Sequence, residues 1–283
     1  MEISLGKDWN TFYIDNDIYA ASGKSYEISE RIDRGGNAAV HECINNEGDV
    51  FAVKFQLSNG DRNIERFEQE IKALKEINHP QIIRYIDHGT VNLLNRKGEE
   101  RSIMFLIMEK ADSNLIAYMT NHEKIGYEIY APQFRGLAEA LKVLHQHAIH
   151  RDIKPENILV KGETWLLSDF GLCSYLDESE HQDITCVNEK VGPKFWLSPE
   201  AIDQRYFGEQ EISTFSDVYQ LCAVFWFVLT RHHPTGLLTL EQDELDPEII
   251  GVISRSLMND CHCRPQNGKE LYDLMCKVTF DKE

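Results

Sequence analysis

The amino-acid sequence predicts an α+β protein built from two lobes. Alternating apolar and polar residues dominate the first part of the chain, and a single helix-like segment interrupts them. In the later part, apolar residues recur every three or four positions. Strands followed by helices, in this order, favour two lobes over one doubly wound sheet.

The first lobe is expected to contain an antiparallel sheet. Residues 26–32 alternate between apolar and polar side chains, residues 39–43 continue after two glycines, and residues 50–55 follow a turn signal. Residues 82–86 and 103–108 predict two further strands, and the polar stretch 92–101 between them predicts an exposed hairpin loop. Residues 1–25 show no clear periodicity and are expected to form an extension.

One amphipathic helix is predicted inside this strand-rich part. Asp61 is a candidate cap, and Pro80 ends the segment. The apolar stripe of the helix consists of Ile64, Phe67, Ile71, Leu74 and Ile77.

Helices are expected to dominate after about residue 131. One is marked by Phe134, Leu137, Leu141 and Leu144, and others are expected at 215–230, 249–257 and 268–278. The predicted organisation is an extension over 1–25, a first lobe over 26–111 and a second lobe over 112–283.

Composition limits the classes of partner. The chain has 283 residues with 29 Lys and Arg against 47 Asp and Glu, a net charge of −18, which disfavours general binding to nucleic acid or anionic membranes. We expect no signal peptide, and the most apolar window, 218–230, is too short to span a bilayer. Seven scattered cysteines favour a reducing, cytoplasmic location. Residues 261–263 read Cys-His-Cys but lack a second ligand pair, so no metal is expected there.

An ordered set of motifs carries the strongest functional signal. Residues 150–157 read HRDIKPEN, and DFG follows at residues 169–171. With these motifs the chain resembles the eukaryotic-type protein kinase family over about residues 26–280, and Lys154 favours the Ser/Thr type. The resemblance implies the bilobal protein kinase fold, with a small antiparallel-sheet N-lobe that carries one key helix and a larger, mainly helical C-lobe.

The chemistry of phosphoryl transfer explains these residue types. Asp152 can orient the accepting hydroxyl or take its proton, and Lys154 can reach the transferred phosphoryl group. Asn157 and Asp169 offer hard oxygen ligands of the kind that Mg²⁺ prefers. The expected cofactors are therefore ATP and Mg²⁺.

Lys54 and Glu70 are expected to form an ion pair. Lys54 lies in an apolar strand, and Glu70 falls on the apolar stripe of the predicted helix, where a charge needs a counter-charge. The resemblance implies that this pair positions the nucleotide phosphates; Glu68 is the alternative partner. The remaining ATP-binding residues that the resemblance implies are Gly35, Gly36, Val40, Ala52, Met108, Glu109, Ala111 and Leu159.

The glycine-rich loop departs from the family pattern G-x-G-x-x-G-x-V. Asp33 stands at the first glycine position and Ala38 at the third. A carboxylate at position 33 adds an anion near the phosphates and weakens nucleotide binding, unless its side chain points away or meets Arg34.

The segment after residue 169 is expected to regulate activity and bind substrate. Thr185 is the first candidate phosphosite, with Ser174, Tyr175 and Ser179 behind it, and Arg151 would hold the phosphate. The acidic cluster 177–180 could supply the charge instead, and a plain solvated loop is the third alternative.

Three further residues follow from the resemblance. Glu200 should pair with Arg264, and Asp217 should bond the backbone of the catalytic loop. Pro193 replaces the threonine usual in Ser/Thr kinases, which keeps dual or tyrosine specificity open.

The expected activity is transfer of the ATP γ-phosphate to Ser or Thr hydroxyls of proteins, with autophosphorylation in a transient homodimer. Glu156 and the acidic stretch 241–248 would favour basic residues near the target hydroxyl. The alternatives are a pseudokinase that acts as a nucleotide-binding scaffold, and a small-molecule phosphotransferase on a related fold.

Overall fold

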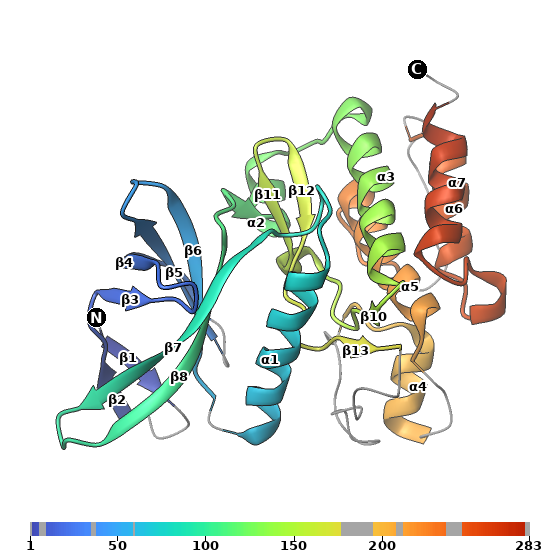
Figure 1. Ribbon diagram of the computed structural model, residues 1–283. Coiled ribbons are helices and arrows are strands. Elements are labelled where there is room, and N and C mark those ends of the chain that lie inside the picture. The colour runs from blue at the N-terminus through green and yellow to red at the C-terminus, as the bar shows by residue number, and fades with distance from the viewer. Residues whose placement is uncertain are drawn as a thin grey trace. The chain divides into compact units, whose positions relative to one another are not determined.

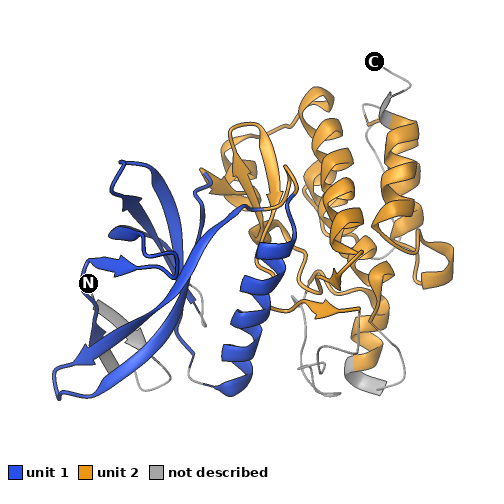
Figure 2. Ribbon diagram, in the orientation of Figure 1, with its two compact units in different colours: residues 1–78, 83–111 blue, residues 79–82, 112–283 orange. Residues whose placement is uncertain are grey.

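The computed structural model describes residues 2–5, 10–34, 38–58, 60–176, 195–207, 212–235 and 245–280. Its contacts divide the chain into two compact units, shown in Figure 2. Unit 1 comprises residues 1–78 and 83–111, and unit 2 comprises residues 79–82 and 112–283. The main boundary thus falls between Ala111 and Asp112.

Unit 1 is an eight-stranded antiparallel sheet with one helix (Figure 1). The strand order is β1-β2-β7-β8-β6-β5-β4-β3. The helix α1 spans Asp61–Glu76. The strands are β1 (Glu2–Leu5), β2 (Asn10–Tyr13), β3 (Asp17–Tyr19), β4 (Ser25–Arg34), β5 (Ala38–Asn45), β6 (Val50–Gln56), β7 (Tyr85–Asn95) and β8 (Glu100–Glu109).

The hydrophobic core of unit 1 lies on one face of this sheet. Cys43 of β5 and Phe55 of β6 are fully buried in it, whereas the alternate residues Val40 and Lys54 belong to the opposite face. The helix α1 meets that opposite face, because its Glu70 bonds Lys54. The strands predicted around 26–32, 39–43 and 50–55 are confirmed.

Helix α1 is confirmed, but its start differs from the prediction, and of its predicted apolar stripe Ile64 is 36% exposed and Ile77 follows the last helical residue. Phe67, Ile71 and Leu74 are buried. Asp61 is the first helical residue rather than the cap; Gly60 occupies the cap position and makes no side-chain cap bond.

The N-terminal residues contribute three strands to the sheet, where the sequence showed no clear periodicity. Phe12 and Ile18 are each 1% exposed and belong to the core. Strand β2 pairs with β7, and β3 pairs with β4. Just beyond β3, the Ala21 N–H donates to the His88 carbonyl of β7 at 2.7 Å, so the sheet curls back on itself.

The predicted hairpin loop at 92–101 is mostly strand. Strand β7 continues to Asn95 and β8 begins at Glu100, which leaves a short turn. The Asn95 side chain accepts the N–H groups of Lys97 and Glu99, both at 2.9 Å. The polar sequence reflects exposed positions that alternate with buried Leu93, a pattern that the loop interpretation overlooked.

Unit 2 is mainly helical, and the helices predicted in this part of the chain are confirmed. Phe134 and Phe225 stack at its centre with ring centroids 3.9 Å apart. None of the described helices is long and apolar enough to cross a membrane. The helices are α2 (Leu115–Asn121), α3 (Tyr127–Leu144), α4 (Pro199–Phe207), α5 (Thr214–Thr230), α6 (Pro247–Ser256) and α7 (Gly268–Phe280), with the 3₁₀ turns η1 (Pro155–Asn157) and η2 (Cys261–Cys263).

Short strands complete unit 2. The strand pair β10–β13 flanks the catalytic-loop region, and β11 pairs with both β12 and β9. Ile82, predicted to lie in a strand of the first lobe, instead forms a single bridge to Leu167 within unit 2. The strands are β9 (Ser113–Asn114), β10 (Ala148–Ile149), β11 (Ile158–Lys161), β12 (Thr164–Leu167) and β13 (Ser174–Tyr175).

Candidate active site

Lys54 and Glu70 form a close ion pair inside unit 1. The Lys54 Nζ lies 2.6 and 2.8 Å from the two carboxylate oxygens of Glu70. The Glu70 side chain is 3% exposed, whereas Glu68, the alternative partner, is exposed. A buried carboxylate bonded through both oxygens fixes the position of the ammonium, so α1 determines where Lys54 presents its charge.

The predicted nucleotide-binding residues of unit 1 share one face of the sheet. Val40 is directly opposite Lys54 across strands β5 and β6, and Ala52 is opposite Met108 across β6 and β8. Directly opposed residues point to the same side of a sheet. These four side chains therefore lie on the face that α1 meets, away from the hydrophobic core.

The end of strand β8 is tied to Arg84. The Glu109 N–H donates to the Arg84 carbonyl at 3.0 Å, and the Arg84 N–H donates to the Glu109 carboxylate at 2.9 Å. Ala111 ends unit 1, and Leu159 lies in β11 of unit 2. Gly35 and Gly36 lie outside the described residues. An ATP site formed from both units stays a prediction.

In unit 2, the catalytic loop brings three of the predicted residues together. The Lys154 Nζ donates to Asp152 Oδ2 at 2.9 Å, and the Asn157 amide nitrogen donates to the same oxygen at 2.8 Å. Asn157 also donates to the Asp152 backbone carbonyl at 2.9 Å. Two donors on one oxygen orient the carboxylate and leave Oδ1 as the better proton acceptor.

The surroundings of Asp152 raise its pKa. Burial, and secondarily the nearby charge of Asp169, raises the pKa of Asp152, although Lys154 opposes the rise. A carboxylate with a raised pKa is a stronger base, and the two aspartates together favour a cation between or beside them.

The donor set of unit 2 fits a magnesium ion. Both hydrogen bonds that the Asn157 side chain makes with Asp152 come from its amide nitrogen, so its amide oxygen is the atom suited to bind a metal ion. Asp169 supplies a carboxylate and adopts a left-handed backbone with φ 61°, a conformation that costs energy in a non-glycine residue. Hard amide and carboxylate oxygens are the ligands that Mg²⁺ prefers.

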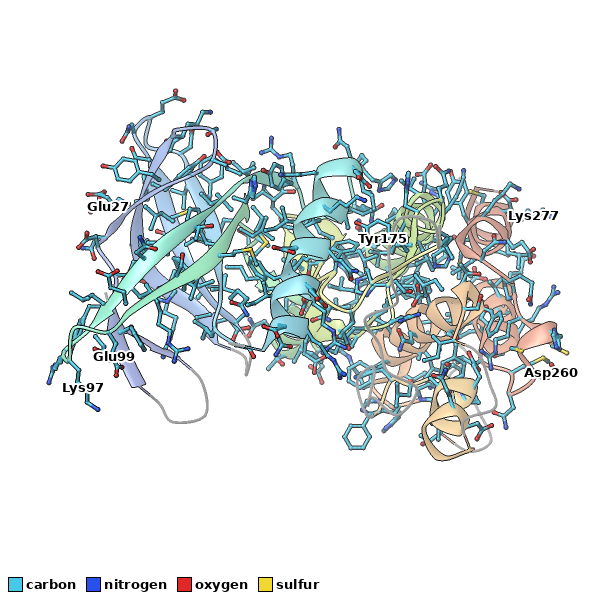
Figure 3. The ribbon with its side chains drawn as sticks, turned by 60° about the horizontal axis from the view of Figure 1, so that its bottom comes forward. Glu27, Lys97, Glu99, Tyr175, Asp260 and Lys277 are labelled. Atoms are coloured by element: carbon cyan, nitrogen blue, oxygen red, sulfur yellow. The ribbon has the colours of Figure 1, made fainter. Side chains whose placement is uncertain are left out.

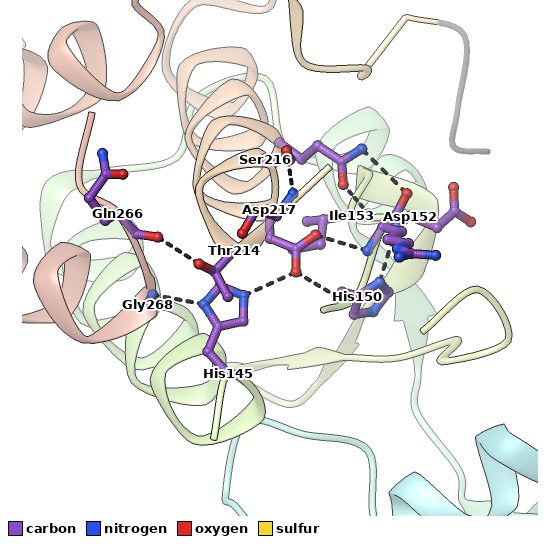
Figure 4. Close-up of polar contacts among 12 residues, drawn as sticks. His145, His150, Asp152, Ile153, Thr214, Ser216, Asp217, Gln266 and Gly268 are labelled. Atoms are coloured by element: carbon purple, nitrogen blue, oxygen red, sulfur yellow. Dashed lines mark hydrogen bonds and ion pairs between the residues drawn. The ribbon is translucent and has the colours of Figure 1, made fainter. Parts of the chain in front are cut away.

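Asp217 anchors the catalytic loop, as predicted (Figure 4). This fully buried carboxylate accepts the N–H groups of His150 at 2.6 Å and Arg151 at 2.8 Å. Burial alone would raise the pKa of Asp217, but hydrogen bonds, first of all from His145, hold it below the ordinary value. The anchor stabilises the left-handed backbone of Arg151, whose φ is 68°.

Two residues of this anchor were missed in the sequence. Gln220 accepts the Ile153 N–H at 3.0 Å and donates to the Arg151 carbonyl at 3.4 Å. His145 contacts Asp217 through Nε2 at 3.0 Å and accepts the Gly268 N–H through Nδ1 at 2.9 Å. The position of Gln220, a polar residue in a long apolar helix three places after Asp217, was the available signal.

His150 links the catalytic loop to the DFG segment. Its Nδ1 accepts the Asp152 N–H at 3.3 Å, and its Nε2 lies 3.1 Å from the Ser168 carbonyl. These partners assign the proton to Nε2 in the neutral ring. The ring also packs on Phe170, with centroids 5.0 Å apart. The buried His150 side chain thus joins the catalytic loop to the DFG segment through both contacts.

The Glu200–Arg264 pair is confirmed as a buried, bidentate ion pair. The two guanidinium nitrogens lie 2.9 Å from the two carboxylate oxygens, and both side chains are at most 2% exposed. Burial would raise the pKa of Glu200, but the Arg264 hydrogen bonds and charge hold it below its usual value. Of the other predicted residues of this segment, Ser179, Thr185 and Pro193 lie outside the described residues.

Potential metal ligands also meet away from this site. The donor atoms of Asp260, Cys261 and His262 lie within 4.8 Å of one another at the surface (Asp260 is labelled in Figure 3). Cys263 Sγ lies 3.6 Å from the Asp260 carboxylate. The sequence expectation of no metal here stays a prediction.

Comparison with known proteins gives one family. The protein kinase domain model matches residues 26–281. The chain is 29% identical over 227 residues to a probable serine/threonine-protein kinase PknB of Bifidobacterium longum. This match covers 76% of this chain and 31% of that protein. It is 28% identical over 262 residues to a probable serine/threonine-protein kinase PknB of Lactococcus lactis, and this match covers 90% of this chain and 38% of that protein.

A third relative is named for a different specificity. The dual specificity protein kinase Ttk of Danio rerio is 27% identical over 221 residues, with 75% of this chain and 21% of that protein covered. The chain thus spans well under half the length of these relatives. Because the family model matches nearly the whole chain, and because the catalytic loop and its anchor have the geometry described above, this chain belongs to the protein kinase family.

Proposed function

We propose that the chain is an active kinase that uses ATP and Mg²⁺ to phosphorylate Ser and Thr hydroxyls of proteins. The observation that supports this most is the arrangement around Asp152. Lys154 and Asn157 both bond one of its oxygens, and burial raises its pKa. This arrangement suits a group that orients a hydroxyl and accepts its proton.

The roles of the other residues follow from their chemistry. Lys54, fixed by Glu70, would bind the phosphates of the nucleotide. Lys154 would stabilise charge on the transferred phosphoryl group. Asn157 and Asp169 would hold Mg²⁺, which neutralises phosphate charge when bound.

Ser/Thr specificity is proposed on two grounds. Lys154 is typical of the catalytic loop of Ser/Thr kinases, and two of the relatives above are named as serine/threonine-protein kinases. Pro193 and the dual-specificity relative favour the alternative. Phosphoamino-acid analysis of the labelled product separates the two: phosphotyrosine would contradict the proposal.

A scaffold without turnover is the second candidate, favoured by Asp33 and Ala38 in the glycine-rich loop. The test incubates the purified chain with Mg²⁺, γ-labelled ATP and a basic protein substrate. We expect label on protein, lost in Asp152→Asn and in Lys54→Met. Normal ATP binding without label in the wild type would support the scaffold instead.

We further propose basic protein substrates, autophosphorylation between two copies and a cytoplasmic location. Glu156 is exposed beside the catalytic loop, where it can attract a basic side chain. Autophosphorylation between copies predicts an initial rate per molecule that rises with protein concentration; a constant rate would contradict it. The six cysteines of the described residues are free thiols, which suits a reducing compartment.

A further inference from the structure

Asp33 occupies a row of side chains that crosses three strands of unit 1. Asp33 of β4 is directly opposite Val40 of β5, and Val40 is directly opposite Lys54 of β6. Opposed residues project to the same side of a sheet. The three side chains therefore share one face, and Asp33 does not point into the hydrophobic core on the other.

The register on either side supports this placement. Arg34, the next residue, is opposite Ala39, and Ala39 belongs to the buried core. The pairing is irregular at two places between Ile28 and Asp33, yet alternation counted from the core residue Ile28 also places Asp33 on the face opposite the core. In its pairing with Val40, Asp33 is exposed on the Lys54 side of the sheet.

This position puts a negative charge near the place where nucleotide phosphates bind. Neighbouring strands lie about 4.8 Å apart, so the backbones of residues 33 and 54 are separated by roughly 10 Å. In protein kinases, the lysine corresponding to Lys54 pairs with the nucleotide phosphates, and a glycine-rich loop covers them. A carboxylate here therefore faces the same phosphates as the ammonium of Lys54.

We propose that Asp33 is a specificity-determining residue that selects the metal-charged form of the nucleotide. The inference rests on the ATP binding proposed above. Metal-free ATP carries more negative charge than Mg²⁺-bound ATP, so the carboxylate repels it more strongly. Nucleotide binding by this chain therefore depends on Mg²⁺ more steeply than it would with an uncharged residue at position 33.

The experiment measures nucleotide affinity by isothermal titration calorimetry of the full chain, in excess Mg²⁺ and in EDTA. Asp33→Asn should raise the affinity for metal-free ATP by about three- to tenfold, as expected for one charge removed at this range. It should raise the affinity for Mg²⁺-bound ATP by clearly less. Asp33→Glu should behave as wild type. Adenosine has no phosphate, so its affinity should be the same in all three proteins.

Glu27→Gln is the matched control. Glu27, labelled in Figure 3, is an exposed carboxylate of the same strand, about 20 Å along it from Asp33. This variant loses the same charge and should keep wild-type affinities in both conditions. Equal tightening in Glu27→Gln and Asp33→Asn would show a general effect of net charge and overturn the proposal.

The remaining outcomes separate this inference from the proposed function. Unchanged ATP affinity in Asp33→Asn, or equal changes for ATP and adenosine, would overturn the role of Asp33 alone, provided that Lys54→Met still weakens ATP binding. If the wild type binds ATP neither in excess Mg²⁺ nor in EDTA, the proposed function is overturned, and the role of Asp33 with it.

Discussion

Gln220 lies one helical turn after Asp217 on α5, and the two side chains bond the same stretch of backbone. Asp217 accepts the N–H groups of His150 and Arg151, and Gln220 accepts that of Ile153. Both side chains are at most 2% exposed. The backbone of the catalytic loop is thus anchored to helix α5 of unit 2, in addition to the hydrogen bonds inside the loop.

Replacing Gln220 should damage both stability and activity. Gln220→Leu leaves the buried N–H of Ile153 without its acceptor, which should cost about 1–3 kcal/mol of unfolding free energy. Urea denaturation measures this loss, and kinase assays should show lower kcat. Gln220→Glu keeps the acceptor for Ile153 but loses the donor to the Arg151 carbonyl and buries a second carboxylate near Asp217, so it should also destabilise the chain. A wild-type unfolding free energy in Gln220→Leu would contradict the role assigned to the Ile153 bond.

Glu70, and not Glu68, should matter for phosphoryl transfer. Glu70→Gln weakens the attraction that fixes Lys54, and we expect kcat/KM for ATP to fall by about tenfold or more. Glu68→Gln removes an exposed charge on the same helix and should stay within about twofold of wild type. Steady-state kinetics at varied ATP would decide, and a larger effect of Glu68→Gln would contradict the pairing.

The Glu200–Arg264 pair should make stability sensitive to acid. Because the folded-state pKa of Glu200 is lowered, the stability it contributes is present above the ordinary glutamate pKa and is lost as pH falls through the folded value. Glu200→Gln should cost about 3–5 kcal/mol at neutral pH, since it leaves Arg264 buried without its counter-charge.

Urea denaturation at a series of pH values tests this prediction. The difference between wild type and Glu200→Gln should shrink as the medium becomes acidic. Asp273→Asn, which removes the exposed partner of Lys269, should leave the urea midpoint nearly unchanged at neutral pH. A gap between wild type and Glu200→Gln that is independent of pH would show that ionisation of Glu200 is not the cause.

A side chain at Gly136 of α3 should destabilise the chain, whereas one at Gly251 of α6 should not. A Cβ at Gly136 would overlap the Gln81 side chain, which bonds Gln133 at 3.1 Å and the Trp165 carbonyl at 3.3 Å. Gly136→Ala should cost about 1–3 kcal/mol by thermal or urea unfolding. The penalty should be smaller in a Gln81→Ala background, where the obstacle is absent.

The Gly251→Ala variant is the control, because no heavy atom outside the backbone of its own helix and its chain neighbours lies within 4 Å of its Cβ position. It should be neutral or stabilise by up to about 1 kcal/mol, as alanine favours the helix more than glycine does. Similar destabilisation by both alanines would mean that the overlap with Gln81 is not the reason.

The N-terminal strands should contribute strongly to the stability of unit 1. Phe12 is 1% exposed in its core, so Phe12→Ala should cost about 3–5 kcal/mol. Tyr19, 70% exposed on β3, provides the contrast, and Tyr19→Ala should change the unfolding free energy by well under 1 kcal/mol. A Phe12→Ala chain as stable as Tyr19→Ala would show that these strands do not support the core.

Local patterns in the sequence were enough for the helices and most strands. The stripe of Phe67, Ile71 and Leu74 predicted α1, and the same stripe placed Glu70 where it pairs with Lys54. The motifs around Asp152 predicted the catalytic loop because its residues are close in sequence.

Features that depend on distant pairing were harder to predict. Phe12 and Ile18 are single apolar residues in the short strands β2 and β3. The strands that pair with these two, β7 and β4, could not be inferred from the local sequence. The partner of Asp33 across the sheet, Val40, is set by an irregular register with β5 that no local pattern shows. The role of Gln220 required knowing which loop lies beside α5, which no periodicity gives.

The three N-terminal strands also decide where this chain can be cut. The family match begins at Tyr26, after β3. A chain trimmed to that match would leave β4 with an unpaired row of backbone groups and would uncover apolar side chains beneath β2 and β3. Such an edge is a template for strand pairing between molecules, so the trimmed chain should aggregate where the full chain stays dispersed.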